Sequence, residues 1–266
     1  MPKISIICTV KNGEATIKDT IESVLAQTMR VWEFIIVDDG SDDQTLNIMQ
    51  EYQRKDNRIK VIATSGIGRG KALNLSVDNA KGDYIINIDA DDLMHPQKLE
   101  VQYNIMKVNQ KYFLLSTNSH IIYTEDTIDW EEINAKNIKI QDVTRKNLIK
   151  NQVNHSSVMM RKDILVELGK YSEDRRSQFD YELWLRAGYM GYKIGKINRQ
   201  LVAKRIHSEQ SFESKRLGHL SRSIKLQTSF ILKSKKVYLL VFPIGRIIMG
   251  ILPFKARQKF NKIIKM

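Results

Sequence analysis

The sequence has a single cysteine and no long uninterrupted apolar run. Cys8 is the only cysteine among 266 residues, so no disulfide can form within the chain, which favours a reducing compartment. Because it lies inside the apolar run 4–8, we expect it to be buried and unreactive. The longest mostly apolar stretch, residues 237–254, falls short of the ~20 apolar residues that a membrane-spanning helix needs. It is also interrupted by Pro243, Gly245, Arg246, Gly250 and Pro253.

Acidic residues are absent from the C-terminal segment 214–266. That segment holds 13 of the 43 Lys and Arg residues and none of the 30 Asp and Glu residues. The net charge of +13 therefore belongs to this segment, and the whole-chain charge is no argument for binding nucleic acid. Helical spacing places four apolar residues on one face: Leu217, Leu220, Ile224 and Ile231. Such a helix either lies on an anionic membrane surface or packs on the rest of the protein with its basic face in solvent.

The chain begins without the features of a signal peptide. Residues 1–3 lead directly into an apolar run, with no apolar core and small-residue cleavage site of the usual kind. We therefore expect a cytoplasmic location, peripheral on the inner face of the cell membrane if the C-terminal segment binds lipid.

Apolar runs alternate with amphipathic segments through the first 110 residues. The pattern predicts strands at 4–8, 32–37, 59–62 and 84–88, and helices at 16–26, 44–53, 71–79 and 96–109. Strands this apolar, separated by helices, favour a mostly parallel sheet with helices on both faces. After residue 115 the pattern loosens. It predicts strands near 157–160, 192–197 and 201–206, and helices near 162–168 and 180–189.

Polar side chains follow three of the predicted strands. The first runs into Thr9–Glu14, the second ends in Asp38–Asp43, and the fourth ends in Asp89–Asp92. In a doubly wound sheet these strand ends lie side by side and form one crevice. Three carboxylates within four positions are costly to bury without a cation, and their oxygens suit Mn²⁺ or Mg²⁺ on a diphosphate. Each segment could instead be an ordinary turn, and Asp92 could cap the following helix.

A glycine-rich segment, Ser65–Gly70, follows the third predicted strand. A dinucleotide-binding loop would follow the first strand, where this chain has only Gly13, so we do not expect a nicotinamide cofactor. Arg69 and Lys71 place positive charge beside the loop, which suits a diphosphate. A flexible turn before the next helix is the alternative.

Taken in order, these motifs resemble the family 2 inverting glycosyltransferases of the GT-A fold. The resemblance covers about residues 3–212 and rests on segments 12–14, 37–41, 70–74, 89–92, 154–162, 180–186 and 205–208. It implies an α/β GT-A fold with a Rossmann-like, mostly parallel central sheet and helices on both faces. Residues 1–115 would form the nucleotide-sugar half, residues 116–213 the acceptor half, and residues 214–266 a helical basic tail.

The resemblance also implies roles for individual residues on the donor side. Asp39 would hydrogen-bond the uracil edge, with Thr9, Asn12 and Glu14 near the nucleoside. Asp89 would lie near the ribose.

The remaining implied roles concern the metal and the chemistry. Asp91 would ligate the Mn²⁺ or Mg²⁺ that bridges the two phosphates, and Asp180 would be the general base. His207 could touch phosphate or metal, although a lone histidine is more often structural. Phe179 stands where the family usually has Glu.

We therefore expect a metal-dependent inverting glycosyltransferase. It would move a sugar from a nucleotide-diphosphate donor, a UDP-sugar in the first instance, to a hydroxyl of a lipid-linked or growing glycan in surface polysaccharide assembly. The alternative is a non-catalytic protein whose basic tail binds membrane or nucleic acid. The acidic strand ends argue against nucleic acid, because carboxylates repel phosphates when no metal lies between them.

Overall fold

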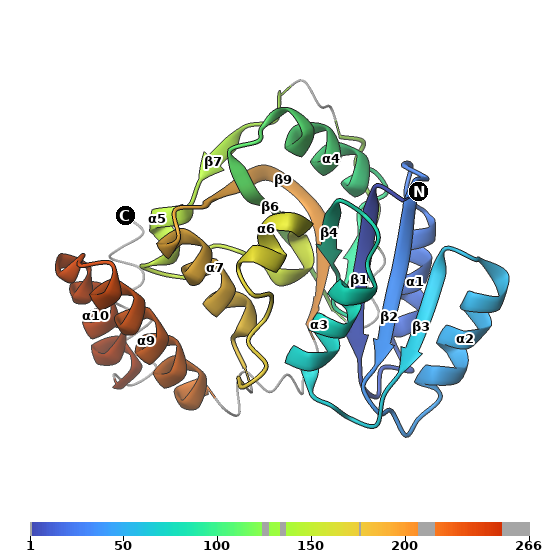
Figure 1. Ribbon diagram of the computed structural model, residues 1–266, viewed down its shortest axis with the longest axis horizontal. Helices are drawn as coiled ribbons and strands as arrows, with labels where there is room; N and C mark the ends of the chain where they lie inside the picture. Colours follow the sequence, from blue (N-terminus) through green and yellow to red (C-terminus); the bar gives the residue numbers. More distant parts are fainter. Residues whose placement is uncertain (1, 124–127, 134–136, 176, 207–215, 252–266) are drawn as a thin grey trace.

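The structure is a computed structural model that describes residues 2–123, 128–133, 137–175, 177–206 and 216–251. These residues form a mixed α/β fold around one sheet (Figure 1). Its strands are β1 (Ile4–Val10), β2 (Trp32–Asp38), β3 (Ile59–Ala63), β4 (Tyr84–Asn87), β5 (Leu93–Met94), β6 (Tyr112–Tyr123), β7 (Ile140–Asp142), β8 (Met159–Arg161) and β9 (Lys193–Ile206). Its helices are α1 (Ile17–Leu25), α2 (Thr45–Lys55), α3 (Arg69–Asn79), α4 (Lys98–Val108), α5 (Thr144–Asn147), α6 (Lys162–Glu167), α7 (Phe179–Tyr189), α9 (Arg216–Lys233) and α10 (Val241–Ile251), with 3₁₀ turns η2 (His155–Ser157) and η3 (Val237–Leu240).

The strand order is β3-β2-β1-β4-β8-β6-β9-β5, and β7 pairs with β9. Strands β1 to β4 are parallel to one another, β8 is antiparallel to both of its neighbours, and β6 is parallel to β9. Strands β1, β2 and β4 are buried at nearly every position, because helices cover both faces of the sheet. The mostly parallel α/β fold predicted from the sequence is confirmed.

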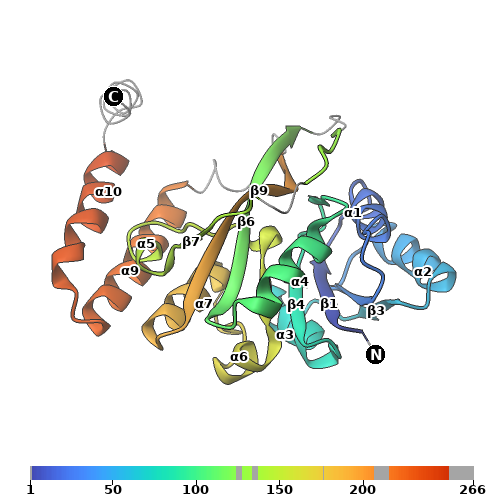
Figure 2. The same cartoon turned by 90° about the horizontal axis from the view of Figure 1, so that it is seen from above.

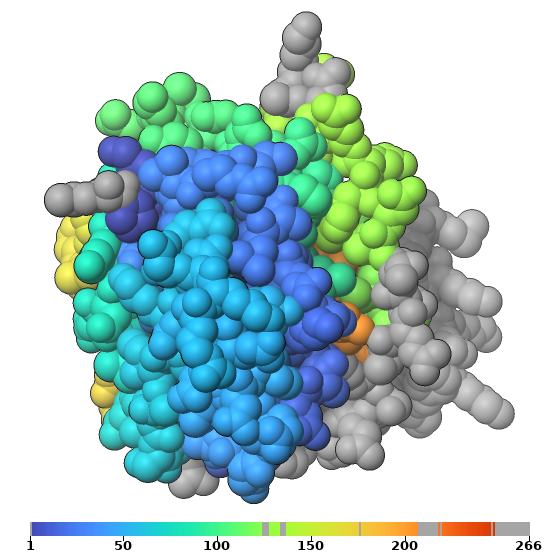
Figure 3. Space-filling view, turned by 90° about the vertical axis from the view of Figure 1, so that its right-hand side faces the viewer, coloured from blue at the N-terminus to red at the C-terminus, as the bar shows by residue number. Residues whose placement is uncertain are grey.

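Successive side chains of β1 point to opposite faces of the sheet and enter two separate cores. Ile4, Ile6 and Cys8 pack with residues of α1, α2 and α4, whereas Ile7 packs with residues of α3, α6 and α7. Figures 1 and 2 show the two helical layers, and Figure 3 shows the face that the N-terminal half makes, in blue to green. Cys8 is buried and free, and burial raises the pKa of its thiol, which agrees with an unreactive residue.

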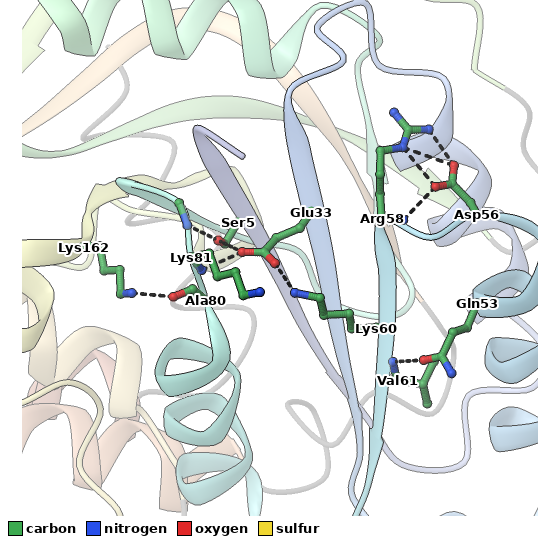
Figure 4. Close-up of polar contacts among 11 residues, drawn as sticks. Ser5, Glu33, Gln53, Asp56, Arg58, Lys60, Val61, Ala80, Lys81 and Lys162 are labelled. Carbon is green, nitrogen blue, oxygen red and sulfur yellow. Dashed lines mark hydrogen bonds and ion pairs between the residues drawn. The ribbon is translucent and has the colours of Figure 1, made fainter. Parts of the chain in front are cut away.

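A polar network joins the N-terminal ends of the first strands, at the opposite end of the sheet from the crevice (Figure 4). Buried Glu33 accepts hydrogen bonds from the Ser5 hydroxyl at 2.7 Å and the Lys81 backbone N–H at 2.6 Å. Its other carboxylate oxygen lies 2.5 Å from Nζ of Lys60. Burial by itself would raise the pKa of Glu33, but these donors outweigh it and hold the pKa below its usual value. The network therefore holds the N-terminal ends of β1, β2 and β3 and the turn before β4 in fixed positions relative to one another.

Some predicted elements of the second half differ from the structure. Strand β6 covers residues 112–123, where no strand was predicted, and β9 is one strand where two were predicted. Asp92 does not cap a helix: its Oδ1 accepts the backbone N–H of Arg205 at 3.0 Å, the next two residues form β5, and α4 begins only at Lys98.

The described part of the C-terminal segment packs on the body of the protein. Helix α9 lies against α7 and buries Leu226, Phe230 and Ile231. The side-chain amide of Gln227 donates to backbone carbonyls in the segment after α5. Helix α10 lies beside α9, at the end of the molecule away from β3 (Figures 1 and 2). None of the helices that the structure describes has the length and apolar character needed to span a bilayer.

Candidate active site

The C-terminal ends of β1, β2 and β4 meet around a cavity of about 690 Å³, which we call the nucleotide cavity. Thr9 and Asn12 line it from β1 and the following loop, Asp39 lines it from the end of β2, and Asp89 and Asp91 line it from the end of β4. The structure thus brings together the three polar segments that the sequence places at separate strand ends.

The loop after β1 and the loop after β2 hold each other in place. Asn12 has a φ of 55°, its backbone N–H donates to the Ser41 hydroxyl at 2.9 Å, and its side-chain oxygen accepts from the N–H of Asp42 at 3.1 Å. The carboxylate of Glu14 accepts the N–H of Gln44 at 2.9 Å. Glu14 therefore joins the two loops. It is not one of the described residues that line the cavity.

Asp39 anchors the glycine-rich loop between β3 and α3. Its carboxylate accepts the backbone N–H groups of Ile67 at 2.7 Å and Gly68 at 3.0 Å. The loops approach closely: Gly40 has a φ of +80°, and a Cβ at this position would lie 2.8 Å from the backbone nitrogen of Gly66. Only glycine fits this conformation and this contact without strain. Asp39 thus positions the loop while facing the cavity.

An ion pair links the glycine-rich loop to the acidic strand end. Arg69, in the first turn of α3, places a guanidinium nitrogen 2.5 Å from Oδ1 of Asp89. Burial by itself would raise the pKa of Asp89, but the positive charge of Arg69 outweighs it and lowers the pKa to about 2. The guanidinium also lies 5.5 Å from the ring centre of Phe179. Lys71 is exposed and lines neither of the cavities described here.

The acidic strand end is compatible with a divalent cation that also binds a diphosphate. Asp92 is buried, and burial, followed by the charges of Asp89 and Asp91, raises its pKa to about 8. Among the described residues, no group of three or more His, Cys, Asp or Glu side chains could hold a metal alone. Mg²⁺ in such sites usually has one or two carboxylate ligands and takes the rest from phosphate and water, so Asp91 suffices as the protein ligand. His207 lies outside the described residues.

A second and larger cavity, of about 1420 Å³, adjoins the first, and we call it the acceptor cavity. Three residues line both cavities: Arg69, Asp89 and Lys204. Asp180 lines only the acceptor cavity, from the first turn of α7, and the position before this helix is occupied by Gln178, so Asp180 is not its N-cap. Among the residues that the structure describes, no hydrogen bond or ion pair occupies the Asp180 carboxylate.

The family model for glycosyl transferase family 2 matches residues 5–167, which is more than half of the chain. The chain belongs to this family. It is therefore an enzyme of the glycosyltransferase class, not a non-catalytic binding protein. An uncharacterized glycosyltransferase of Methanocaldococcus jannaschii is 32% identical over 217 residues, covering 80% of this chain and 74% of the relative. EpsE of Bacillus subtilis is 32% identical over 203 residues, covering 73% of this chain and 70% of EpsE.

Solved structures share the fold of this glycosyltransferase. TarS of S. aureus in complex with UDP-GlcNAc superimposes with a TM-score of 0.71 at 20% identity, covering 92% of this chain and 72% of the TarS chain. The mannosyltransferase PcManGT of Pyrobaculum calidifontis, in complex with GDP-Man and Mn²⁺, gives a TM-score of 0.66 at 13% identity, covering 99% of this chain and 80% of that chain. Both likenesses support the GT-A fold.

Two parts of this glycosyltransferase site were not found from the sequence. His155 is buried beside Asp89, with Nδ1 3.7 Å from the Asp89 carboxylate and 3.1 Å from the Asn87 amide nitrogen, and its Nε2 lies 2.9 Å from the Tyr171 hydroxyl. The Asn87 amide nitrogen is a donor, so Nδ1 accepts from it and Nε2 carries the proton that faces the Tyr171 hydroxyl; burial also lowers the pKa of His155. Lys204 immediately precedes the segment 205–208 that carried part of the resemblance, but only the pairing of β9 with β6 and β5 places it at the junction of the cavities.

Proposed function

We propose that the protein transfers a sugar, with inversion, from a UDP-sugar to an acceptor hydroxyl. One observation supports this most strongly: the nucleotide and acceptor cavities meet at Arg69, Asp89 and Lys204, and Asp180 lies on the acceptor side of that junction. A nucleotide-sugar bound on one side would present its sugar to a hydroxyl bound on the other. TarS bound to UDP-GlcNAc and PcManGT bound to GDP-Man support a nucleotide-sugar donor.

Residues 1–115 would bind the nucleoside of the donor. Asp39 would accept a hydrogen bond from the uracil edge, since a carboxylate has about four lone-pair sites and three donors, Thr64, Ile67 and Gly68, already use it. Thr9 and Asn12 would line the nucleoside site, and Glu14 would support it through the loop contact to Gln44. Asp89 would face the ribose.

The diphosphate would be neutralised by a metal and by fixed cations. Mn²⁺ or Mg²⁺ held by Asp91 would act as a Lewis acid toward the charge that develops on the leaving diphosphate. Arg69 and Lys204 would add preorganised positive charge at the same junction. Lys71 would contribute from the solvent side of α3. His207 as a second metal or phosphate contact stays a prediction, because it lies outside the described residues.

Asp180 would act as the general base of the transfer. Its carboxylate would take the proton from the acceptor hydroxyl, a contribution of ~10²–10⁴-fold in rate for a well-placed base. The acceptor oxygen would attack the anomeric carbon from the face opposite the diphosphate, and this geometry inverts the configuration. Residues 116–213 would form most of the acceptor half in this division of the chain.

The C-terminal segment would hold the enzyme at the inner face of the membrane, where a lipid-linked glycan is accessible. Helix α10 and the turn before it expose six large apolar residues: Val237, Tyr238, Val241, Phe242, Ile244 and Ile247. Lys233, Lys235 and Lys236 lie just before them in the chain. Apolar side chains bordered by lysines are typical of helices that bind an anionic membrane surface.

The metal and donor assignments are tested by calorimetry of UDP binding with and without Mn²⁺. Wild type should bind UDP more tightly with Mn²⁺. Asp91→Ala should lose this stimulation, and the control Asp163→Ala, an exposed carboxylate of α6 outside both cavities, should keep it. Metal-stimulated binding that persists in Asp91→Ala would remove Asp91 from its proposed role. Incubation with a panel of UDP-sugars, Mn²⁺ and lipid-diphosphate sugar acceptors would identify the transferred sugar.

A further inference from the structure

The acceptor cavity contains more positive charge than the proposed transfer reaction requires. Lys150, Lys196 and Arg222 line it but do not line the nucleotide cavity. They come from separate parts of the chain: the segment after α5, strand β9 and helix α9. In the described part of the chain, none of the three forms an ion pair with a carboxylate. The carboxylates among the described lining residues are Asp89 and Asp180, and Asp89 is already paired with Arg69.

Lys196 is the most informative of these cations, because it is partly withdrawn from solvent. Its ammonium group donates to the backbone carbonyl of Gln152 at 3.2 Å, and burial lowers the pKa of the side chain. An ammonium group has three N–H donors, so this contact leaves two for a ligand. A partly buried ammonium group without a countercharge loses some of its hydration, and a bound anion would offset part of that loss.

The positive charge is spread along the cavity. Lys196, Gln200 and Lys204 all line it from strand β9, which pairs with β6 along its length. Lys204 follows Lys196 by eight positions, which corresponds to at most ~26 Å at about 3.3 Å per residue. Lys204 lies at the junction with the nucleotide cavity, so Lys196 belongs to a more distant part of a long site.

We propose that the acceptor is acidic: it carries phosphate or carboxylate groups that bind to Lys150, Lys196 and Arg222 while its hydroxyl lies at Asp180. This inference rests on the proposed function. The planar guanidinium of Arg222 suits both kinds of anion, because it can donate two parallel hydrogen bonds to either. Since Arg222 comes from α9, the C-terminal segment then contributes to acceptor recognition in addition to membrane binding.

Binding of three short probes to the full-length protein, saturated with UDP and Mn²⁺, tests the proposal. Trigalacturonate carries carboxylates, a trimer of glycerol phosphate carries phosphodiesters, and the trimethyl ester of trigalacturonate is the neutral control. At least one anionic probe should bind roughly 10-fold more tightly than the neutral ester, as expected for three ion pairs of ~0.5 kcal/mol each. The stronger of the two anionic probes identifies the preferred group. Raising the salt concentration should weaken its binding.

The triple variant Lys150→Gln, Lys196→Gln, Arg222→Gln should lose this preference for anions while keeping its UDP affinity and its melting temperature. The matched control removes three exposed lysines outside both cavities: Lys18→Gln, Lys107→Gln and Lys111→Gln. It should bind the anionic probes as wild type does. Equal binding of neutral and anionic probes, or an unchanged preference in the triple variant, would overturn the proposal. Failure to bind UDP would instead contradict the proposed function, so the two failures are distinguishable.

Discussion

Replacing Gly40 by alanine should disturb the nucleotide cavity, although Gly40 itself does not line it. Gly40 follows Asp39 and has a φ of +80°, and an added Cβ would lie 2.8 Å from the backbone nitrogen of Gly66. A backbone atom cannot swing away as the end of a side chain can. The glycine-rich loop must therefore move, and its movement strains the hydrogen bonds from Ile67 and Gly68 to the Asp39 carboxylate.

The magnitude follows from two contributions. A non-glycine residue in the left-handed region costs ~1–2 kcal/mol, and Gly191→Ala isolates this cost, because Gly191 has a φ of +93° and nothing within 4 Å of an added Cβ. A lost hydrogen bond to a charged group adds ~1.5–3 kcal/mol. Gly40→Ala should therefore lower the free energy of unfolding by about 2.5–5 kcal/mol, against about 1–2 kcal/mol for Gly191→Ala.

Urea denaturation of both variants measures the difference, and UDP titration reports the effect on the cavity. Gly40→Ala should bind UDP more weakly than wild type, whereas Gly191→Ala, which follows α7, should bind it normally. Equal destabilisation of the two variants together with unchanged UDP affinity would refute the argument that the loops approach closely enough to require glycine.

Two further predictions concern buried charges. Lys98 is fully buried, its Nζ has no hydrogen-bond partner among the described residues, and burial lowers its pKa from 10.5 to about 7. The folded state therefore binds fewer protons than the unfolded state between about pH 7 and pH 10.5, and stability should rise with pH over this window. Lys98→Met should flatten that rise and stabilise the protein near pH 7 by up to ~5 kcal/mol; a steeper or unchanged pH dependence of unfolding would contradict this. Glu33, whose pKa is lowered on balance, contributes stability above its unfolded pKa that is lost as the pH falls through its folded pKa. Glu33→Gln should cost ~1–3 kcal/mol at pH 7 and less at pH 3, as measured by urea unfolding at the two pH values, whereas an equal cost at both would show that the charge is unimportant.

The first half of the fold could be predicted from the sequence because its signals are local. Strands β1, β2 and β4 are mostly apolar runs buried on both faces, and the helices of this half have regular amphipathic spacing. The second half was harder because its strands are exposed along part of their length. In β6, the polar residues Asn118, Ser119 and His120 interrupt the apolar run, and the register with β9 shifts at the same place. In β9, polar residues at 198–200 made one strand resemble two.

Some residues of the candidate site could likewise be predicted from local sequence patterns, whereas others reach the site only through tertiary packing. The sequence places Thr9, Asp39 and Asp91 at strand ends, and parallel-sheet geometry then brings them into one cavity. The contribution of α9 through Arg222 depends on how that helix packs against α7, which no local pattern reveals. The Asp92 carboxylate accepts the backbone N–H of Arg205, a residue 113 positions away in the chain. Local sequence spacing cannot predict a contact between residues so far apart in the chain.

The most direct test of the proposed transfer reaction is the turnover of Asp180→Asn, measured with the sugar donor and acceptor that the panel identifies. The amide keeps the shape of the side chain but cannot take the acceptor proton. The rate of transfer should therefore fall by ~10²–10⁴-fold, while the affinity for UDP with Mn²⁺ stays near wild type. Turnover at the wild-type rate in Asp180→Asn would contradict the assignment of Asp180 as the base.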